Sequence, residues 1–314
     1  MMRVFSSSDV AAALPIADCI EAVEAGFVAH ARGRTIEPGV LGTHVPGGGF
    51  HVKTAGLTGD RSYFAAKVNA NFPGNPAARG LPTVQGALIL FDAECGIPLA
   101  IMDSGEITKL RTAAASAVAA RHLARRDALV ATIVGCGMQG RIHVDALLAV
   151  RPLRQIFLYD ADRRVSDRLA AESSRPGVTF TVVDALRDGT LESDIVATCT
   201  SARAPILGWA DLRPGAFVAA VGADWDTKQE LEVDLMKRSV VIADILEQCA
   251  EIGDLHHAIA AGLMTAQDVR GELADVVTGR VGRRNDDEII VFDSTGTAIE
   301  DVAAAVHVFS KAST

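Results

Sequence analysis

The amino-acid sequence predicts an α/β protein with a doubly wound parallel sheet and a second, discontinuous α+β domain. The main observation is a strict alternation of apolar, strand-like segments with helical segments after about residue 129. Before residue 105 the pattern differs, since one helical segment is followed by several short strands and turns. A chain of 314 residues, 49% of them hydrophobic, can fill the cores of two domains of ordinary size.

The first third of the chain is the α+β part. Apolar residues recur at helical spacing from Ile16 to Phe27 and predict an amphipathic helix over residues 16–30. Short alternating or apolar segments predict strands, and segments rich in Gly and Pro predict turns. The expected strands are 50–53, 63–68 and 84–91, and the expected turns are 39–49 and 69–82.

The alternating part is preceded by a strong helix former over residues 107–123. The final stretch, 289–309, predicts one more strand and a helix, and we expect it to return to the first domain. The expected domains are therefore 1–112 with 292–314, and 113–291. Within the second domain the expected strands are 129–134, 155–160, 178–183, 194–198, 216–221 and 240–243, and the expected helices include 139–150 and 162–172.

Composition excludes several classes of function. The formal net charge of -9 argues against nucleic acid or an anionic membrane as the main partner. The first ten residues have no apolar signal-peptide core, and no run of 18 apolar residues suggests a membrane span. Five cysteines without a CxxC pair or a Cys/His cluster predict neither a disulfide framework nor a metal site, and favour the cytoplasm. The adjacent His256 and His257 are expected to be structural.

A glycine motif follows the strand expected at 129–134. Residues 135–140 read Gly-Cys-Gly-Met-Gln-Gly, a GxGxxG that opens a helix. Gly135 makes the tight turn, Gly137 lets the backbone approach a pyrophosphate, and Gly140 allows close helix–strand packing. The strand before and the helix after support a dinucleotide site in a Rossmann-type sheet; the alternative is that these glycines only turn a loop.

Asp160 ends the next strand, 20 residues beyond the last glycine of the motif. A carboxylate there accepts hydrogen bonds from the ribose hydroxyls and repels a 2′-phosphate, so NAD is favoured. Arg163 and Arg164 lie close in sequence and keep NADP possible.

Three charged residues are candidates for the chemistry. Asp224 follows the strand expected at 216–221, at the sheet edge where ligands bind, and a carboxyl group there can donate a proton to nitrogen. Lys67 and Arg111 are candidates for binding a substrate carboxylate. The alternatives are a helix-capping role for the aspartate and snorkelling or ion-paired side chains for the two cations.

Several segments resemble the ornithine cyclodeaminase/mu-crystallin family, which also holds alanine dehydrogenases and ketimine or imino-acid reductases. The most specific feature is the pairing of the RTAAAS helix with the GxGxQ loop. The matching segments are Lys67-Val68-Asn69, Gly80 to Thr83, Phe91-Asp92, Ile107-Thr108, Leu110 to Ala115, Gly135 to Gln139, Gly222-Ala223-Asp224, Lys228 to Leu231 and Phe292 to Gly296.

The resemblance implies roles for individual residues. Lys67 looks like the lysine that binds the substrate carboxylate, Arg111 like the arginine shared by carboxylate and nicotinamide, and Asp224 like the acid that handles the substrate nitrogen. Thr295 is expected beside the substrate. The family also implies a homodimer built through sheets of the discontinuous substrate-binding and dimerisation domain. Residues expected at the dinucleotide are Thr83, Arg111, Gly135, Gly137, Met138, Gln139, Gly140, Asp160, Thr200, Val221, Gly222, Ala223, Lys228 and Ser294.

The sequence departs from the ornithine cyclodeaminases at one point. Ornithine cyclodeaminases of the family it resembles carry a glutamate on the strand before the substrate lysine, whereas this chain has Phe50-His51-Val52-Lys53-Thr54 there. His51 and Lys53 share one face of a strand. If that face lines the pocket, the substrate side chain is neutral or anionic rather than an ammonium.

Together these features predict an NAD(P)-dependent oxidoreductase acting on the C–N bond of a small amino or imino acid. One alternative is an ammonia-lyase that cyclises a diamino acid with recycled NAD. Another is a protein of the mu-crystallin kind that binds a dinucleotide and a ligand without turnover.

Overall fold

The computed structural model describes residues 2–312. The chain forms two compact units, which we call the first unit (Met1–Thr112 with Thr297–Thr314) and the second unit (Ala113–Gly296). Helix α4, Ser104–Leu123, contributes residues to both. No helix within the described residues is both long and apolar enough to span a bilayer.

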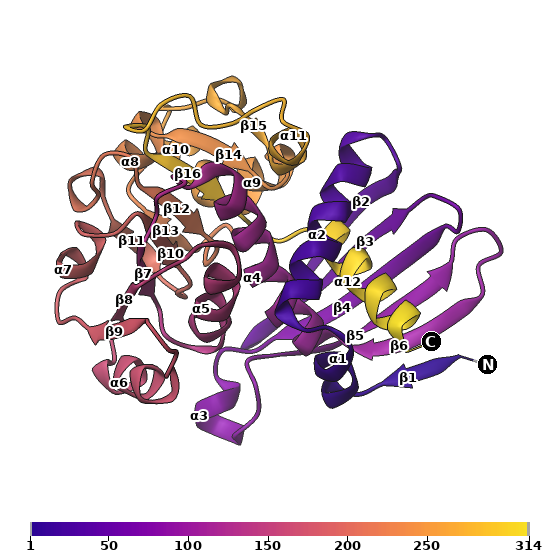
Figure 1. Ribbon diagram of the computed structural model, residues 1–314. Helices are drawn as coiled ribbons and strands as arrows, with labels where there is room; N and C mark the ends of the chain where they lie inside the picture. The colour runs from indigo at the N-terminus through magenta and orange to yellow at the C-terminus, as the bar shows by residue number, and fades with distance from the viewer. Residues whose placement is uncertain (1, 313–314) are drawn as a thin grey trace. The chain divides into compact units, whose positions relative to one another are not determined.

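The first unit is built on a six-stranded sheet in the order β1-β6-β5-β4-β3-β2 (Figure 1). Strands β2 to β6 pair antiparallel with their neighbours, and β1 is parallel to β6. The strands are β1 Arg3–Phe5, β2 Thr35–Val45, β3 Gly48–Leu57, β4 Tyr63–Asn71, β5 Val84–Asp92 and β6 Pro98–Asp103.

Two long helices of the first unit pack against each other, and one of them, α12, packs against this sheet. Helix α2, Ile16–Ala31, confirms the predicted helix, and its apolar stripe with Ile20, Val23 and Phe27 is fully buried. Helix α12, Ala298–Lys311, crosses strands β3 and β4 (Figure 1). This packing buries the sheet face that carries the odd-numbered residues of β3 and β4. The shorter helices are α1 Ser7–Ala13 and α3 Asn75–Arg79.

The prediction of turns over 39–49 was wrong. Residues 35–45 form strand β2, which pairs with β3 around a turn at Pro46 and Gly47, where Gly47 has φ +83°. Pro38 lies where the register of β2 shifts, and β2 is the outermost strand, so the missing N–H and weak strand propensity are tolerated. Cross-strand pairing therefore outweighs the composition. The strands β1 and β6 were also not predicted.

The second unit contains an eight-stranded sheet in the order β15-β14-β16-β12-β10-β7-β8-β9, in which every pairing is parallel. The chain runs outward in one direction from β7 and in the other from β10, which makes the sheet doubly wound and confirms the Rossmann-type fold. The strands are β7 Val130–Val134, β8 Gln155–Tyr159, β9 Thr179–Val182, β10 Ile195–Thr198, β12 Phe217–Ala220, β14 Val240–Ala243, β15 Gly271–Glu272 and β16 Ile290–Asp293.

Helices and a small extra sheet complete the second unit (Figure 1). The extra sheet pairs β11 Arg203–Leu207 with β13 Gln229–Leu231. Buried Val, Leu and Ala side chains of the eight-stranded sheet contribute to the core of the second unit. The helices are α5 Met138–Val150, α6 Arg163–Glu172, α7 Leu186–Thr190, α8 Val233–Arg238, α9 Leu246–Ile252, α10 Asp254–Ala260 and α11 Leu273–Val277.

The last strand differs in place from the expectation. Strand β16 lies between β12 and β14 in the second unit, and the chain enters the first unit only at Thr297. The expected crossing at residue 292 therefore cuts through a buried strand. All four residues of β16 are buried, which is typical of an interior strand of a parallel sheet.

Candidate active site

The glycine turn between β7 and α5 has the shape of a phosphate cradle. Gly135 has φ +89°, and a Cβ there would lie 2.8 Å from the carbonyl oxygen of Cys199. A Cβ at Gly140 would lie 2.0 Å from the carbonyl oxygen of Gly135. At Gly137, by contrast, a Cβ would meet nothing within 4 Å. Two glycines are thus required by the fold, and the third faces open space.

Helix α5 begins directly behind this open space. Its N-cap is Gly137, and no described side chain caps the helix start. The first-turn amides, which include those of Met138 and Gln139, therefore remain available to an anion, and the helix dipole adds to their attraction. The residues present fit a dinucleotide pyrophosphate.

Asp160 lies just after β8 and braces the glycine turn. Its Oδ2 accepts the Cys136 N–H at 2.8 Å, and its Oδ1 accepts the Asp162 N–H at 3.0 Å. The two nearby arginines are already paired with carboxylates. Arg163 contacts Asp184, and Arg164 contacts Asp162 at 2.8 Å.

The carboxyl ends of four strands form one row at this edge of the sheet. The register places Thr198 beside Val134 on one side and beside Ala220 on the other. Ala220 lies beside Asp293 in turn. The residues that follow these strands, which include the predicted dinucleotide contacts Thr200, Val221, Gly222, Ala223 and Ser294, are therefore gathered along one edge.

Asp224 and Lys228 lie on the loop that follows β12. The Lys228 ammonium contacts the Asp224 carboxylate at 2.5 Å, and the Asp224 side chain is 45% exposed. The Asp224 N–H donates to the Gly222 carbonyl at 3.1 Å, and the Lys228 N–H donates to the Trp225 carbonyl at 2.9 Å. The loop is therefore a pair of tight turns rather than the start of a helix.

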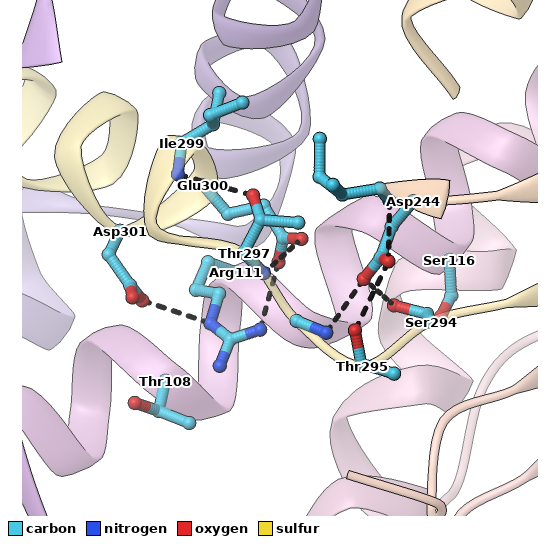
Figure 2. Close-up of polar contacts among 12 residues, drawn as sticks. Thr108, Arg111, Ser116, Asp244, Ser294, Thr295, Thr297, Ile299, Glu300 and Asp301 are labelled. Atoms are coloured by element: carbon cyan, nitrogen blue, oxygen red, sulfur yellow. Dashed lines mark hydrogen bonds and ion pairs between the residues drawn. The ribbon is translucent and has the colours of Figure 1, made fainter. Parts of the chain in front are cut away.

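Two buried carboxylates that the sequence analysis did not single out support this edge. Asp244, which follows β14, accepts hydrogen bonds from Ser294 Oγ and Thr295 Oγ1 at 3.2 Å and from the Gly296 N–H at 2.7 Å (Figure 2). Glu230, on β13, binds the ends of β10 and β12. Their burial was not readable from a single sequence, in which acidic residues usually indicate surface.

The first unit contains a buried cluster of charges. The Lys67 ammonium contacts both carboxylate oxygens of Asp301, at 2.8 and 2.7 Å. Arg111 contacts Asp301 at 3.0 Å and Glu300 at 2.9 Å (Figure 2). All four side chains are at most 6% exposed. The structure therefore brings Lys67 and Arg111 together through two acids of α12.

The cluster is fixed by the start of helix α12. Thr297 caps this helix, and its N–H donates to Glu300 Oε1 at 3.0 Å while Glu300 Oε2 holds Arg111. One carboxylate thus serves the helix cap and the ion pair. The Thr-x-x-Glu spacing at 297–300 is the signal that would have found this arrangement.

Burial changes the acid–base properties of the cluster. Burial of the ammonium is the main cause that lowers the pKa of Lys67 to about 7; the positive charges of Arg111 and Lys53 contribute to this lowering, and Asp301 opposes it. Burial alone would raise the pKa of Asp301, but the charges of Lys67 and Arg111 outweigh it and hold this pKa below its usual value.

The other predicted residues of the first unit lie on neighbouring strands. Lys53 pairs directly across from Lys67, and His51 directly across from Asn69, so all four share the sheet face covered by α12. Lys53 is 6% exposed. Thr83 lies just before β5, where its carbonyl accepts the Phe72 N–H at 2.8 Å. Each unit thus gathers its own share of the predicted residues.

No three or more His, Cys, Asp or Glu side chains within residues 2–312 are placed to hold a metal ion. The histidine pair has separate hydrogen bonds. His257 Nε2 lies 2.7 Å from the Lys228 carbonyl oxygen, and His256 Nδ1 lies 3.2 Å from the Ala250 carbonyl oxygen.

Comparison with known proteins decides the family. The model of the ornithine cyclodeaminase/mu-crystallin family matches residues 1–314. The chain belongs to this family. The resemblance stated from the motifs is therefore confirmed.

Relatives match the chain over nearly its full length. An alanine dehydrogenase of Archaeoglobus fulgidus is 33% identical over 98% of this chain and 94% of its own. The Thermococcus litoralis Δ1-pyrroline-2-carboxylate reductase, solved with NADH and L-proline, is 32% identical, with a TM-score of 0.95 over 99% of this chain and 97% of that one. An archaeal alanine dehydrogenase dimer with bound NAD is 32% identical, with a TM-score of 0.94 over 99% and 96% of the two chains.

Proposed function

We propose that this protein is an NAD-dependent oxidoreductase acting on the C–N bond of a small amino or imino acid. The observation that carries the proposal is the buried pair of cations, Lys67 and Arg111, in a chain whose other unit presents an open glycine cradle. A buried cation pair binds a carboxylate strongly because little water competes for the charges. The named activities of the relatives support the same class of reaction.

In this proposal each group has one task. Lys67 and Arg111 bind and orient the substrate carboxylate, and Asp301 and Glu300 hold both cations in place. When bound, the reduced cofactor supplies a hydride to the imine carbon. Asp224, at the carboxyl edge of the parallel sheet, gives a proton to the imine nitrogen, directly or through water. In reverse, the same carboxylate accepts the proton as the amine is oxidised.

Most of the proposed cofactor contacts belong to the second unit. The first turn of α5 binds the pyrophosphate, and Asp160 accepts the ribose hydroxyls, so that NAD is preferred to NADP. Ion pairing of Arg163 and Arg164 with aspartates supports this preference, because it reduces their availability to a 2′-phosphate. The remaining contacts are proposed at Thr83, Arg111, Thr200, Val221, Gly222, Ala223, Lys228 and Ser294.

Selectivity for the substrate side chain is proposed to lie with His51 and Lys53, with Thr295 as a further contact. Lys53 adds a third buried positive charge directly across the sheet from Lys67. A second ammonium, as in ornithine or lysine, is unfavourable beside it. We therefore expect substrates with a neutral or acidic side chain.

We also propose a homodimer formed through the first unit. Leu41, Phe50 and Val68 are 63%, 41% and 43% exposed and share one face of the six-stranded sheet with Val52. Apolar side chains gathered on one sheet face are typical of an interface. The archaeal relative was solved as a dimer, which supports the proposal.

Free thiols at all five cysteines agree with the proposed location in a reducing cytoplasm.

The test is a spectrophotometric screen of keto acids with ammonia or amines, cyclic imines and amino acids, each with NAD(H) and NADP(H). Change in nicotinamide absorbance with one of these substrates is the expected result. Release of ammonia from ornithine without net change in absorbance would instead identify the lyase.

Asp224→Asn should lower kcat by about 100-fold while the fold is kept, because the side chain is half-exposed. Unchanged turnover of this variant would contradict the assigned role.

A further inference from the structure

Glu230 closes the loop that carries Asp224. Its Oε2 accepts the Gly222 N–H at 2.8 Å and the Thr198 hydroxyl at 2.7 Å. Its Oε1 accepts both the N–H and the hydroxyl of Thr200 at 2.7 Å. One fully buried carboxylate therefore joins the two segments that follow β10 and β12.

The carboxylate is itself held in place. Asp254 Oδ1 accepts the N–H groups of Glu230 and Leu231, both at 2.9 Å, which fixes the short strand β13. Glycine is required at residue 222, since a Cβ there would lie 2.4 Å from Glu230 Cδ. We call Glu230 and its four donated hydrogen bonds the clamp. Burial raises the pKa of Glu230 above its usual value, and the four donated hydrogen bonds only partly offset this rise.

Several contacts hold the loop of residues 222–230 in place. Glu230 binds its first residue, Gly222. Asp224 and Lys228 are paired across the loop, and His257 lies 2.7 Å from the Lys228 carbonyl oxygen. The Glu230 carboxylate connects the acid-bearing loop directly to Thr200, and the Gln229 N–H donates to the Ala202 carbonyl of the same segment at 3.0 Å.

We propose that Glu230 is a positioning residue that fixes Asp224 and the backbone around Thr200 and Gly222 for the reaction. The proposal rests on the proposed role of Asp224 as the acid. Every donor at the clamp points at an oxygen, so the clamp needs a carboxylate. A glutamine in its place would direct an NH₂ group at an N–H or a hydroxyl, and a buried donor would lose its partner.

The test compares Glu230→Gln with Glu272→Gln in the full-length protein. Glu272 is the matched control, since its carboxylate accepts the backbone N–H of Leu246 at 2.7 Å and caps helix α11, elsewhere in the second unit. Hydrogen exchange by mass spectrometry is the first readout and needs no turnover. We expect the amides of Thr200 and Gly222 to exchange at least about tenfold faster in E230Q, with residues outside 198–231 unchanged. E272Q should leave this region as it is in the wild type.

The second readout is kinetic, with NADH and Δ1-pyrroline-2-carboxylate as the probe pair. For E230Q we expect kcat to fall by about 30-fold and KM for the imino acid to change by less than about threefold, since Lys67 and Arg111 are untouched. A wild-type kcat together with wild-type exchange would overturn the proposal, and so would faster exchange spread over the whole chain. If E230Q does not fold, Glu230→Asp, which keeps the charge but shortens the reach, serves the same comparison.

The two proposals fail in different ways. Absence of any turnover by the wild-type protein in the substrate screen would remove the proposed function, while the exchange experiment would still report on the clamp. Normal wild-type turnover with an unaffected E230Q would remove only the role of Glu230.

Discussion

The buried carboxylates of the two units have different roles. In the first unit, Asp301 and Glu300 form ion pairs with the buried cations Lys67 and Arg111. In the second unit, Glu230 and Asp244 accept hydrogen bonds from backbone amides, hydroxyls and a thiol. The first arrangement holds two buried cations in place, and the second fixes loops.

This difference indicates which ligand each unit suits. A small carboxylate is recognised best by fixed positive charge that water cannot screen, and the price of burying that charge is met by resident acids. A dinucleotide is long and is recognised mainly by backbone donors and by loop shape. Substitutions should therefore separate into those that change charge balance and those that change loop geometry.

The largest expected effect follows from removing the charge of Lys67. Lys67→Met removes the ammonium that contacts both carboxylate oxygens of Asp301, so stability should fall by about 3 kcal/mol. Loss of the carboxylate contact should lower kcat/KM by about 10³-fold. Thermal or denaturant unfolding and steady-state kinetics measure the two effects.

The double variant Lys67→Met/Asp301→Asn separates them. Neutralising the acid removes the uncompensated charge, so about 2 kcal/mol of stability should return, whereas activity should stay low. Recovery of activity together with stability would show that Lys67 supports the fold and does not bind substrate.

The glycine turn should give a smaller effect, and the two glycines should differ. Gly137→Ala adds a methyl group in open space, so the fold should be unchanged, while NADH affinity should fall by about 30-fold because the pyrophosphate is kept from the amides. Gly140→Ala forces the backbone at Gly135 to move and should cost about 2 kcal/mol of stability. Unfolding curves and NADH titration distinguish the two, and equal loss of stability in both would contradict the open cradle.

Much of the second unit could be predicted because its signals are local. Parallel strands buried on both faces are continuous apolar runs, and the glycine turn has positions that only glycine can fill, as Gly135 and Gly140 show. The first unit was harder, since β2 contains glycines and a proline and exists because β3 lies beside it. Pairing between distant segments is not written in any one of them.

The site shows the same limit. Lys67 and Arg111 could be proposed from residue type and family resemblance, but their partners Glu300 and Asp301 lie nearly 200 residues or more away in sequence. Glu230 was visible only as part of a motif, because nothing in its spacing indicates a contact with Thr200 or Gly222. A single sequence does not show which distant residues will contact an acid and so allow it to be buried.

The charge cluster should also give a pH dependence. With the pKa of Lys67 lowered from 10.5 to about 7, the folded protein loses this proton earlier than the unfolded chain does. The unfolded state therefore binds more protons between these values, and the contribution of Lys67 to stability rises with pH there. Substrate binding needs the ammonium, so kcat/KM should fall above pH 7, by about tenfold per pH unit. In Lys67→Arg this limb should disappear, because arginine keeps its charge; a limb that stays would assign it to another group.

The smallest expected effect concerns the choice of cofactor and belongs to the second unit alone. Asp160→Asn keeps an oxygen to accept one backbone N–H but removes the negative charge that opposes a 2′-phosphate. The ratio of kcat/KM for NADH to that for NADPH should fall by about tenfold, mostly through tighter NADPH binding, since the charge lies at a partly exposed position. Asp167→Asn is the control, because that carboxylate lies on α6, is 54% exposed and pairs with Arg163. Equal shifts in both variants would mean that the net charge of the surface, rather than the position of Asp160 beside the glycine turn, selects the cofactor.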